Sequence, residues 1–353
     1  MFWHVEGKKC CKDCFGHEWL RDYISNESEE VGTCQYCRKR GSKLITVAEI
    51  GGLFENLMTM YSRSEFGGTS LIDLVQGDWE VFDESLFDKG GASKLLEDIL
   101  LASWDKHSGE PIPDANESYN RKTALDLVEN WDEFLYGDKE EPDFSDIVLE
   151  DLSPYEATIK EGTFFYRARI GWGSEDENER RQPWSGSDIG ANPKGPSARA
   201  NFEGEVVLYC ADQERTAVAE VRPALGHLVS VCRIEITRDF EILDLSRPAR
   251  MPNPFTSEYL AHELEMMGLV NTFAFALSEP LERNDKPEDY LPSQKLAKFI
   301  RDNDFKGIRY PSALDSFKGT NLVMFDHSVY EIGDSKLVKV EDVSVKFDEW
   351  RWG

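Results

Sequence analysis

The chain has 353 residues, of which 40% are hydrophobic and 12% aromatic, so it can bury sizeable cores and is long enough for two domains. This composition excludes a disordered chain, because nine Trp and twenty Phe supply enough apolar surface to offset chain entropy. The formal net charge of -27 argues against bulk nucleic acid as a substrate, since binding to a phosphate backbone depends on Lys and Arg.

The sequence also predicts a cytoplasmic protein without a membrane segment. It contains no run of about twenty apolar residues, and Met1–Glu6 lacks the apolar core of a signal peptide. The cysteines agree with this location, because most of them crowd into the N-terminal region with metal-like spacing. Cys210 and Cys232 are expected to be buried strand residues.

The N-terminal cysteines predict a zinc site. Cys11-x-x-Cys14 and Cys34-x-x-Cys37 form two CxxC segments whose spacing lets four thiolates surround one Zn²⁺. Four thiolates leave no open position for water or substrate, so the zinc is expected to be structural and to stabilise a subdomain over residues 1–45. Cys10 and His17 are alternatives that could each replace one ligand.

Residues 46–150 are predicted to form a helical region, because apolar residues recur there at three- and four-residue spacing. The expected helices are Ile45–Ser62, Ala92–Trp104 and Arg121–Leu135. The acidic segment Gly137–Asp151 is interpreted as a linker, and the alternative is a solvated loop within one larger domain.

Residues 151–353 are predicted to form a mixed α/β domain, in which short β-rich runs alternate with helices. The expected strands contain Thr163–Tyr166, Val206–Tyr209, Leu228–Val231 and Asn321–Phe325. The expected helices are Arg215–Val221, Ser257–Phe275 and Gln294–Asn303. The overall fold class is therefore α+β, with a helical N-terminal part before the α/β domain.

Several short blocks of this C-terminal half resemble, in order and context, the RES domain family, which is named for its Arg, Glu and Ser. The blocks are Phe165-Tyr166-Arg167-Ala168-Arg169, Ser197-Ala198-Arg199-Ala200-Asn201, Val207-Leu208-Tyr209, Thr216-Ala217-Val218-Ala219-Glu220-Val221 and Gly307-Ile308-Arg309-Tyr310-Pro311-Ser312-Ala313. The resemblance covers about Tyr155–Asp326. No single block is specific to the RES family, but the five blocks in this order are.

The family pattern carries over residue by residue. Its Gly-Arg-Trp-Asn block has become Ala198-Arg199-Ala200-Asn201, so the Arg and Asn are present and the Gly and Trp are lost. The Thr-Ala-x-x-Glu helix gives Glu220, and the Gly-Ile-x-Tyr-Pro-Ser block gives Ser312. The resemblance thus implies Arg199, Glu220 and Ser312 as catalytic residues. Asn321 and Phe325 lie where the family has its closing Asn-Leu-x-x-Phe strand.

The resemblance implies a fold akin to the ADP-ribosyltransferases and an enzyme that degrades NAD by cleaving the bond between nicotinamide and ribose. Such proteins act as toxins, commonly paired with an Xre-type DNA-binding antitoxin, and a role in antiphage defence is a related expectation. The N-terminal half is similar to the HEPN/RES N-terminal domain, because Gly32-Thr33-Cys34-Gln35-Tyr36-Cys37 matches its second cysteine block. That half is expected to sense or bind a partner, and an antitoxin or sensor protein is an expected partner of the chain.

The chemistry assigns a role to each residue. Breaking the nicotinamide–ribose bond builds positive charge on the sugar, and Glu220 is the carboxylate expected to stabilise it. Arg167 and Arg199 are expected to bind the phosphates of NAD through their guanidinium groups. Tyr209 is expected to stack on a ring or to bond a ribose hydroxyl, Ser312 to fix the nicotinamide riboside, and Asn321 to bind substrate.

Several alternatives stay open. Water or phosphate could accept the ribosyl group, so hydrolysis and phosphorolysis are both consistent with the sequence. An ADP-ribosyltransferase that moves the same group onto a macromolecule is a second enzyme hypothesis. The altered Gly-Arg-Trp-Asn block supports a third, a zinc-containing binding module without catalysis. The sequence also leaves open whether the chain forms a homo-oligomer.

Overall fold

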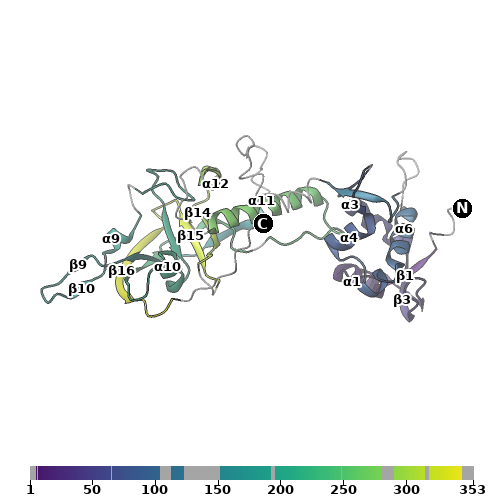
Figure 1. Ribbon diagram of the computed structural model, residues 1–353, viewed down its shortest axis with the longest axis horizontal. Helices are drawn as coiled ribbons and strands as arrows, with labels where there is room; N and C mark the ends of the chain where they lie inside the picture. The colour runs from purple at the N-terminus through teal and green to yellow at the C-terminus, as the bar shows by residue number, and fades with distance from the viewer. Residues whose placement is uncertain are drawn as a thin grey trace. The chain divides into compact units, whose positions relative to one another are not determined.

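The computed structural model describes residues 5, 7–64, 66–103, 113–122, 152–191, 195–247, 249–279, 290–314 and 318–343. The chain divides into two compact units (Figure 1). The first comprises Met1–Asn130 and Arg250–Gly268, and the second comprises Trp131–Ala249 and Leu269–Gly353. The predicted linker Gly137–Asp151 lies outside the described residues.

The first unit begins with a small antiparallel sheet. β1 (Lys9–Cys11) and β2 (Glu30–Thr33) both pair with the central strand β3 (Arg40–Thr46). Both run antiparallel to β3, so the C-terminal ends of β1 and β2 lie at the same end of the sheet. Each CxxC segment starts at or just after one of these strand ends, with η1 (Lys12–Cys14) following β1. The sheet therefore brings the two CxxC segments together.

Helices form most of the remaining described part of the first unit. They are α1 (Glu18–Glu27), α2 (Val47–Gly51), η2 (Gly52–Phe54), α3 (Glu55–Met58), α4 (Leu71–Trp79), α5 (Glu84–Phe87) and α6 (Gly91–Ser103). Thr46 starts α2 with a capping box, in which its hydroxyl accepts from the Glu49 N–H and the Glu49 carboxylate accepts from the Thr46 N–H. The predicted helix Ala92–Trp104 is confirmed as α6, whose Leu95, Leu96 and Ile99 are fully buried.

A second small sheet contains Tyr61 and Ser62 from the predicted helix Ile45–Ser62 and Arg121 from the predicted helix Arg121–Leu135. Residues 123–135 of the latter lie outside the described residues. β4 (Tyr61–Arg63) and β5 (Thr69–Ser70) flank β6 (Ser118–Arg121). The prediction that a helix runs from Ile45 to Ser62 is wrong at both ends, because Ile45 and Thr46 pair within β3 and Tyr61 pairs with Arg121. The apolar spacing in these segments fits helix and strand alike, and the pairing partner decides the outcome.

Residues Arg250–Gly268 pack within the first unit although they are remote from it in sequence. The Phe255 ring lies 4.9 Å from the His17 ring, 5.3 Å from Phe54 and 6.1 Å from Trp19, measured between centroids. The Asn56 side-chain amide donates to the Ser257 carbonyl at 2.6 Å. The sequence predicts this stretch within the domain of residues 151–353, whereas the structure groups it with the first unit.

The second unit is built on an eight-stranded mixed sheet with the order β16-β12-β8-β11-β15-β14-β13-β7. The strands are β7 (Glu156–Ile159), β8 (Phe164–Ile170), β11 (Leu208–Ala211), β12 (Leu228–Ile236), β13 (Phe240–Asp244), β14 (Gly307–Pro311), β15 (Thr320–Met324) and β16 (Tyr330–Lys339). Neighbouring strands are antiparallel except β13 and β14, which are parallel. All of the predicted strands of this half are confirmed, with ends shifted by a few residues.

The two faces of this sheet bury different clusters. Phe165, Leu208, Ile234 and Leu322 belong to the larger apolar core on one face. Val229 and Val231 form a smaller cluster with partly buried residues that include Tyr166, Ala168 and Val218. Val218 belongs to the helix α10 (Glu214–Glu220), so this helix covers the second face. The alternation of side chains along β8 and β12 thus separates a structural core from the face that carries α10.

The remaining elements of the second unit include two longer helices and a hairpin. α11 (Leu260–Ser278) begins within the first unit's residues, and α12 (Leu291–Asp302) precedes β14, which confirms the predicted helices Ser257–Phe275 and Gln294–Asn303 in outline. The short helix α9 (Gly186–Ile189) follows the hairpin of β9 (Ser174–Glu175) and β10 (Arg181–Gln182), which extends away from the main sheet (Figure 1).

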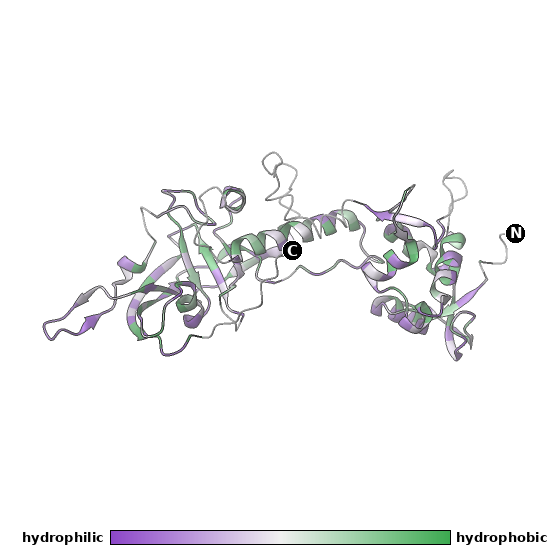
Figure 2. Ribbon diagram, viewed as in Figure 1, coloured by the Kyte–Doolittle hydropathy of each residue, from purple (hydrophilic) through white to green (hydrophobic). Residues whose placement is uncertain are grey.

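Hydropathy follows this architecture. Figure 2 shows apolar residues concentrated in the central strands of the large sheet and polar residues along the β9–β10 hairpin. Within the described part of the chain, no helix combines the length and apolar character needed to cross a membrane.

Candidate active site

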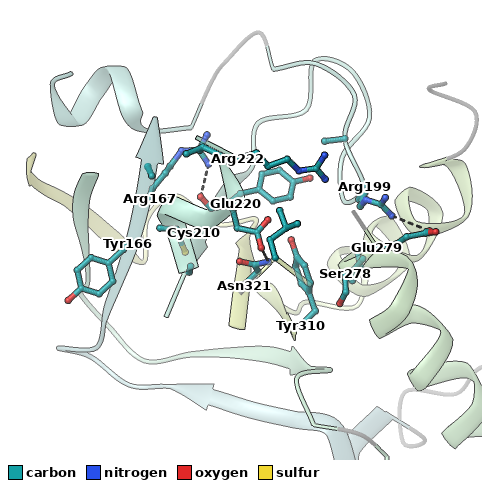
Figure 3. Close-up of a pocket in the computed structure, with 18 residues that line it drawn as sticks. Tyr166, Arg167, Arg199, Cys210, Glu220, Arg222, Ser278, Glu279, Tyr310 and Asn321 are labelled. Carbon is teal, nitrogen blue, oxygen red and sulfur yellow. Dashed lines mark hydrogen bonds and ion pairs between the residues drawn. The ribbon is translucent and has the colours of Figure 1, made fainter. Parts of the chain in front are cut away.

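A cavity of about 320 Å³ opens beside α10 in the second unit (Figure 3). It is lined by side chains from β8, β11, β14, β15, α10, the end of α11 and the loop that contains Arg199. The lining residues are Tyr166, Arg167, Ala168, Ala198, Arg199, Tyr209, Cys210, Ala211, Ala217, Glu220, Val221, Arg222, Leu277, Ser278, Glu279, Tyr310, Leu314 and Asn321. The predicted residues Arg167, Arg199, Tyr209, Glu220 and Asn321 therefore meet in one cavity.

Glu220 is the last residue of α10, and its carboxylate is held at one oxygen. The Ser312 hydroxyl donates to Oε1 at 2.6 Å. The Asn321 side-chain amide donates to the same oxygen at 2.8 Å (Figure 3). Within the described residues, Oε2 has no hydrogen-bond partner. The carboxylate is thus fixed in orientation while one oxygen stays available for a ligand.

The sheet explains why Ser312 and Asn321 meet. Asn321 lies in β15 opposite Tyr310 of β14, and Ser312 follows the end of β14. The Ser312 N–H donates to the Gly319 carbonyl at 2.9 Å, which continues the pairing beyond the strand. Both side chains are buried, with 8% and 7% of Ser312 and Asn321 exposed. Ser312 does not line the cavity itself, so it acts on the site through Glu220.

Arg199 lies on a loop and contacts the end of α11. Its Nη1 donates to the Ala276 carbonyl and lies 3.9 Å from Glu279 Oε2. The guanidinium carbon lies 5.5 Å from the centre of the Tyr290 ring. Only 13% of the Arg199 side chain is exposed. The helix end and Glu279 together hold this cation at the cavity wall, because carbonyl groups at a helix C-terminus attract positive charge.

The loop around Arg199 is fixed by buried amide side chains. The Tyr209 hydroxyl donates to Asn201 Oδ1 at 2.8 Å and accepts from the Ala200 N–H at 3.0 Å. Gln294 Nε2 donates to the carbonyls of Ala198 and Asn201 at 2.8 and 3.0 Å. The ring of Tyr209 lines the cavity while its hydroxyl positions the loop, so the hydroxyl is already engaged. Sequence reasoning missed Gln294, because nothing in its local pattern indicates a loop so remote in sequence.

Arg167 is largely buried in the wall of the cavity. Its Nε donates to the Ile189 carbonyl and its Nη1 to the Tyr209 carbonyl, each at 2.6 Å. Burial lowers the pKa of this guanidinium below its ordinary value. These contacts tie β8 to β11, and they engage two of the nitrogens that the predicted phosphate contact would use. The role of Arg167 toward phosphate stays a prediction.

Tyrosine rings give the cavity an aromatic character. Tyr166, Tyr209 and Tyr310 all line it. Burial raises the pKa of Tyr310 well above its ordinary value, and burial likewise raises that of Tyr209. Both phenols therefore stay protonated at neutral pH and act as neutral surfaces or hydrogen-bonding groups. The charges at the cavity come from arginines and from Glu220 and Glu279.

Two charged lining residues, Arg222 and Glu279, were not predicted. Arg222 follows the C-cap of α10 with a left-handed backbone, φ +46°, and Glu279 follows the end of α11. An Arg two residues after the proposed catalytic Glu is visible in the sequence, but its backbone conformation is not. Glu279 gives no sequence signal, because its role depends on its distance to Arg199.

The first unit holds a second candidate site. The sulfur atoms of Cys11, Cys14, Cys34 and Cys37 all lie within 4.8 Å of one another. The Cys11–Cys37 and Cys14–Cys34 sulfur pairs are 3.5 and 3.3 Å apart. Zn–S bonds of about 2.3 Å in a tetrahedron separate the sulfurs by about 3.8 Å, so the four thiols fit a metal ion of that size.

The two alternative ligands lie outside this cysteine cluster. The Cys10 thiol contacts the Ile45 carbonyl at 3.8 Å, and the His17 ring packs against Phe255. Among the described residues, the group that could hold a metal consists of the four predicted cysteines. The cysteine cluster is closed by its own ligands, which fits a structural and not a catalytic metal.

Comparison with known protein families identifies the part of the chain that contains the cavity. A family model described as the RES domain matches residues 165–348, just over half of the chain. This range includes every residue that lines the cavity. The comparison with curated proteins finds no match.

Proposed function

The chain belongs to the RES domain family, and we propose that it degrades NAD by cleaving the bond between nicotinamide and ribose. The family is associated with NAD-related toxins. The proposed biological role is that of a toxin or defence effector, controlled by an antitoxin or sensor protein that binds it. The fold proposed for the second unit is akin to that of ADP-ribosyltransferases.

The observation that carries the proposal is the orientation of Glu220. Ser312 and Asn321 hold one oxygen of this carboxylate, and the other oxygen has no hydrogen-bond partner among the described residues. Arg199 lines the same cavity. A fixed carboxylate near a cation matches the charge pattern of NAD, in which a cationic nicotinamide is joined through ribose to anionic phosphates.

The chemistry follows from this arrangement. The bond between ribose C1′ and the nicotinamide nitrogen breaks, and its electron pair leaves with neutral nicotinamide. Positive charge develops at C1′, where the Glu220 carboxylate stabilises it. An oxygen of water then bonds to C1′ and its proton passes to Glu220 or to solvent, so that NAD and water give ADP-ribose, nicotinamide and a proton. With phosphate as acceptor, the product is ADP-ribose 1″-phosphate.

We assign a structural zinc ion to the cysteine cluster of the first unit. The sulfur separations fit tetrahedral coordination, and thiolates are ligands that zinc prefers. The ion would hold the ends of β1 and β2 together and so stabilise the first unit. It contributes no step to the reaction.

Product analysis tests the proposed reaction. Purified protein is incubated with adenine-labelled NAD, with and without phosphate, and the products are separated by chromatography. Free ADP-ribose indicates hydrolysis, and a phosphorylated product that requires phosphate indicates phosphorolysis. Label attached to protein or nucleic acid would instead establish ADP-ribosyl transfer, and intact NAD under every condition would contradict the proposal.

A further inference from the structure

Arg222 occupies a backbone conformation that its residue type disfavours. It follows Val221, the C-cap of α10, and its N–H donates to the Ala219 carbonyl at 2.9 Å. Its φ of +46° is left-handed, a region that Gly adopts without strain and that L residues with side chains rarely enter. Pro223 comes next and restricts Arg222 toward extended backbone, so the observed conformation is disfavoured twice.

The strain coincides with the cavity. The structure places several non-glycine residues at positive φ, namely Arg38, Glu80, Glu179, Arg222, Asp304 and Lys318, and of these described residues Arg222 alone lines the cavity. Strained residues of this kind concentrate at functional sites, where a contact offsets the conformational cost. The end of a short helix could have been closed by Gly, and this chain places a guanidinium there.

The charges around Arg222 indicate what it binds. Glu220 lies two residues before it and faces the cavity, and Arg199 lines the same cavity from the opposite loop. In the view of Figure 3, the Arg222 side chain extends from the end of α10 toward the Arg199 loop, with the Glu220 carboxylate below. Glu279 lies 3.9 Å from Arg199, so part of the charge of Arg199 is already balanced within the protein.

We infer that Arg222 is a phosphate-binding residue that works beside Arg199 on the diphosphate group of the substrate, and that its strained backbone is retained for this contact. The inference rests on the proposed function. Glu220 then faces the ribose that loses nicotinamide, while Arg222 and Arg199 face the phosphates. A guanidinium group suits this task because it donates two parallel hydrogen bonds to phosphate oxygens.

The test separates backbone strain from ligand binding. Arg222→Gly removes both, and Arg222→Asn removes the charge while keeping a residue that tolerates left-handed backbone. Asp304→Gly is the matched control. Asp304 has φ +70° just after the C-cap of α12, and its N–H donates to the Arg301 carbonyl at 3.1 Å, so it repeats the backbone geometry of Arg222 away from the cavity.

Calorimetry with two probes gives the readout. ADP-ribose carries the diphosphate, and nicotinamide riboside carries none. Arg222→Gly and Arg222→Asn are expected to weaken ADP-ribose binding by about 10- to 100-fold and to leave nicotinamide riboside binding unchanged. Arg222→Gly and Asp304→Gly are both expected to raise the melting temperature, by about 2–4 °C, because each relieves strain. Asp304→Gly is expected to bind both probes as the wild type does.

The outcomes distinguish this inference from the proposed function. Equal ADP-ribose affinity in the wild type and both Arg222 variants, or no ADP-ribose binding by the wild type, would overturn the role of Arg222. NAD turnover is measured in parallel. If ADP-ribose binding depends on Arg222 but NAD is never consumed, the proposed function fails and the phosphate contact stands.

Discussion

Two neighbouring side chains orient the Glu220 carboxylate by donating hydrogen bonds to the same oxygen. Ser312 Oγ lies 2.6 Å and Asn321 Nδ2 lies 2.8 Å from Oε1. Ser312 does not line the cavity, whereas Asn321 does. Ser312 is therefore a positioning residue, and its loss should affect the chemical step more than substrate binding.

Ser312→Ala is expected to lower kcat by about 10- to 100-fold and to leave KM within about twofold, because Glu220 loses one of the donors that orient it. Ser312→Thr retains the hydroxyl and is expected to recover most of kcat. Steady-state kinetics on NAD measures both parameters. A rise in KM with unchanged kcat in Ser312→Ala would show that the hydroxyl binds substrate directly.

A partly buried ion pair joins two neighbouring strands of the large sheet. Asp244 of β13 lies opposite Arg309 of β14, whose Nε donates to Asp244 Oδ1 at 3.0 Å. The Ser246 hydroxyl donates to the same oxygen at 2.6 Å. Burial opposes ionisation, but the hydrogen bonds from Arg309 and Ser246 outweigh it and hold the pKa of Asp244 below its ordinary value.

This lowered pKa predicts a pH-dependent contribution to stability. The contribution is fully present above the pKa of Asp244 in the unfolded chain, which is about 3.9, and is lost as the pH falls through the lower folded value. Asp244→Asn is therefore expected to lower the free energy of unfolding by about 2 kcal/mol at pH 7 and by less at pH 3, which lies below the unfolded pKa. Urea unfolding at both pH values measures this difference.

Asp239→Asn is the control for this pair. Asp239 bonds Lys160 at 2.8 Å, but both side chains are largely exposed, so its replacement is expected to cost far less at either pH. A difference between wild type and Asp244→Asn that stays constant from pH 7 to pH 3 would show that the carboxylate charge is not the source of the stability.

The cysteine cluster at the strand ends of the first unit predicts a bound metal ion. Purified protein is expected to carry one Zn²⁺ per chain, because the ends of β1 and β2 bring four thiols within 4.8 Å of one another. Cys14→Ser should lose the metal and lower the melting temperature of the first unit. Cys10→Ser should keep it, since the Cys10 thiol lies outside the cysteine cluster. Elemental analysis measures the zinc content of the three proteins. Metal retention in Cys14→Ser would contradict the zinc site at the cysteine cluster.

At the scale of the whole molecule, the ordered blocks of the sequence predicted which residues would meet. The sequence predicted the helix that ends near Glu220 and the strand that contains Asn321. It also predicted the Gly-Ile-x-Tyr-Pro-Ser block that places Ser312 just after β14. The aromatic partners of Phe255 could not be predicted, because Phe255 precedes the predicted helix Ser257–Phe275 and no local pattern says which unit it will join. The strain at Arg222 was invisible for a similar reason, since φ is set by the turn and not by residue type.

Whether Glu220 drives the cleavage of NAD is measured as loss of NAD on incubation with purified wild-type protein, Glu220→Gln and Glu214→Gln. Glu214 lies on the same helix α10 and bonds Lys336 at 2.7 Å, and it does not line the cavity, so its variant controls for the change in charge. We predict rapid loss with the wild type and Glu214→Gln, and at least a hundredfold slower loss with Glu220→Gln, about the effect of removing one electrostatic group from an active site. Equal rates for all three proteins would contradict the role of Glu220 in NAD cleavage.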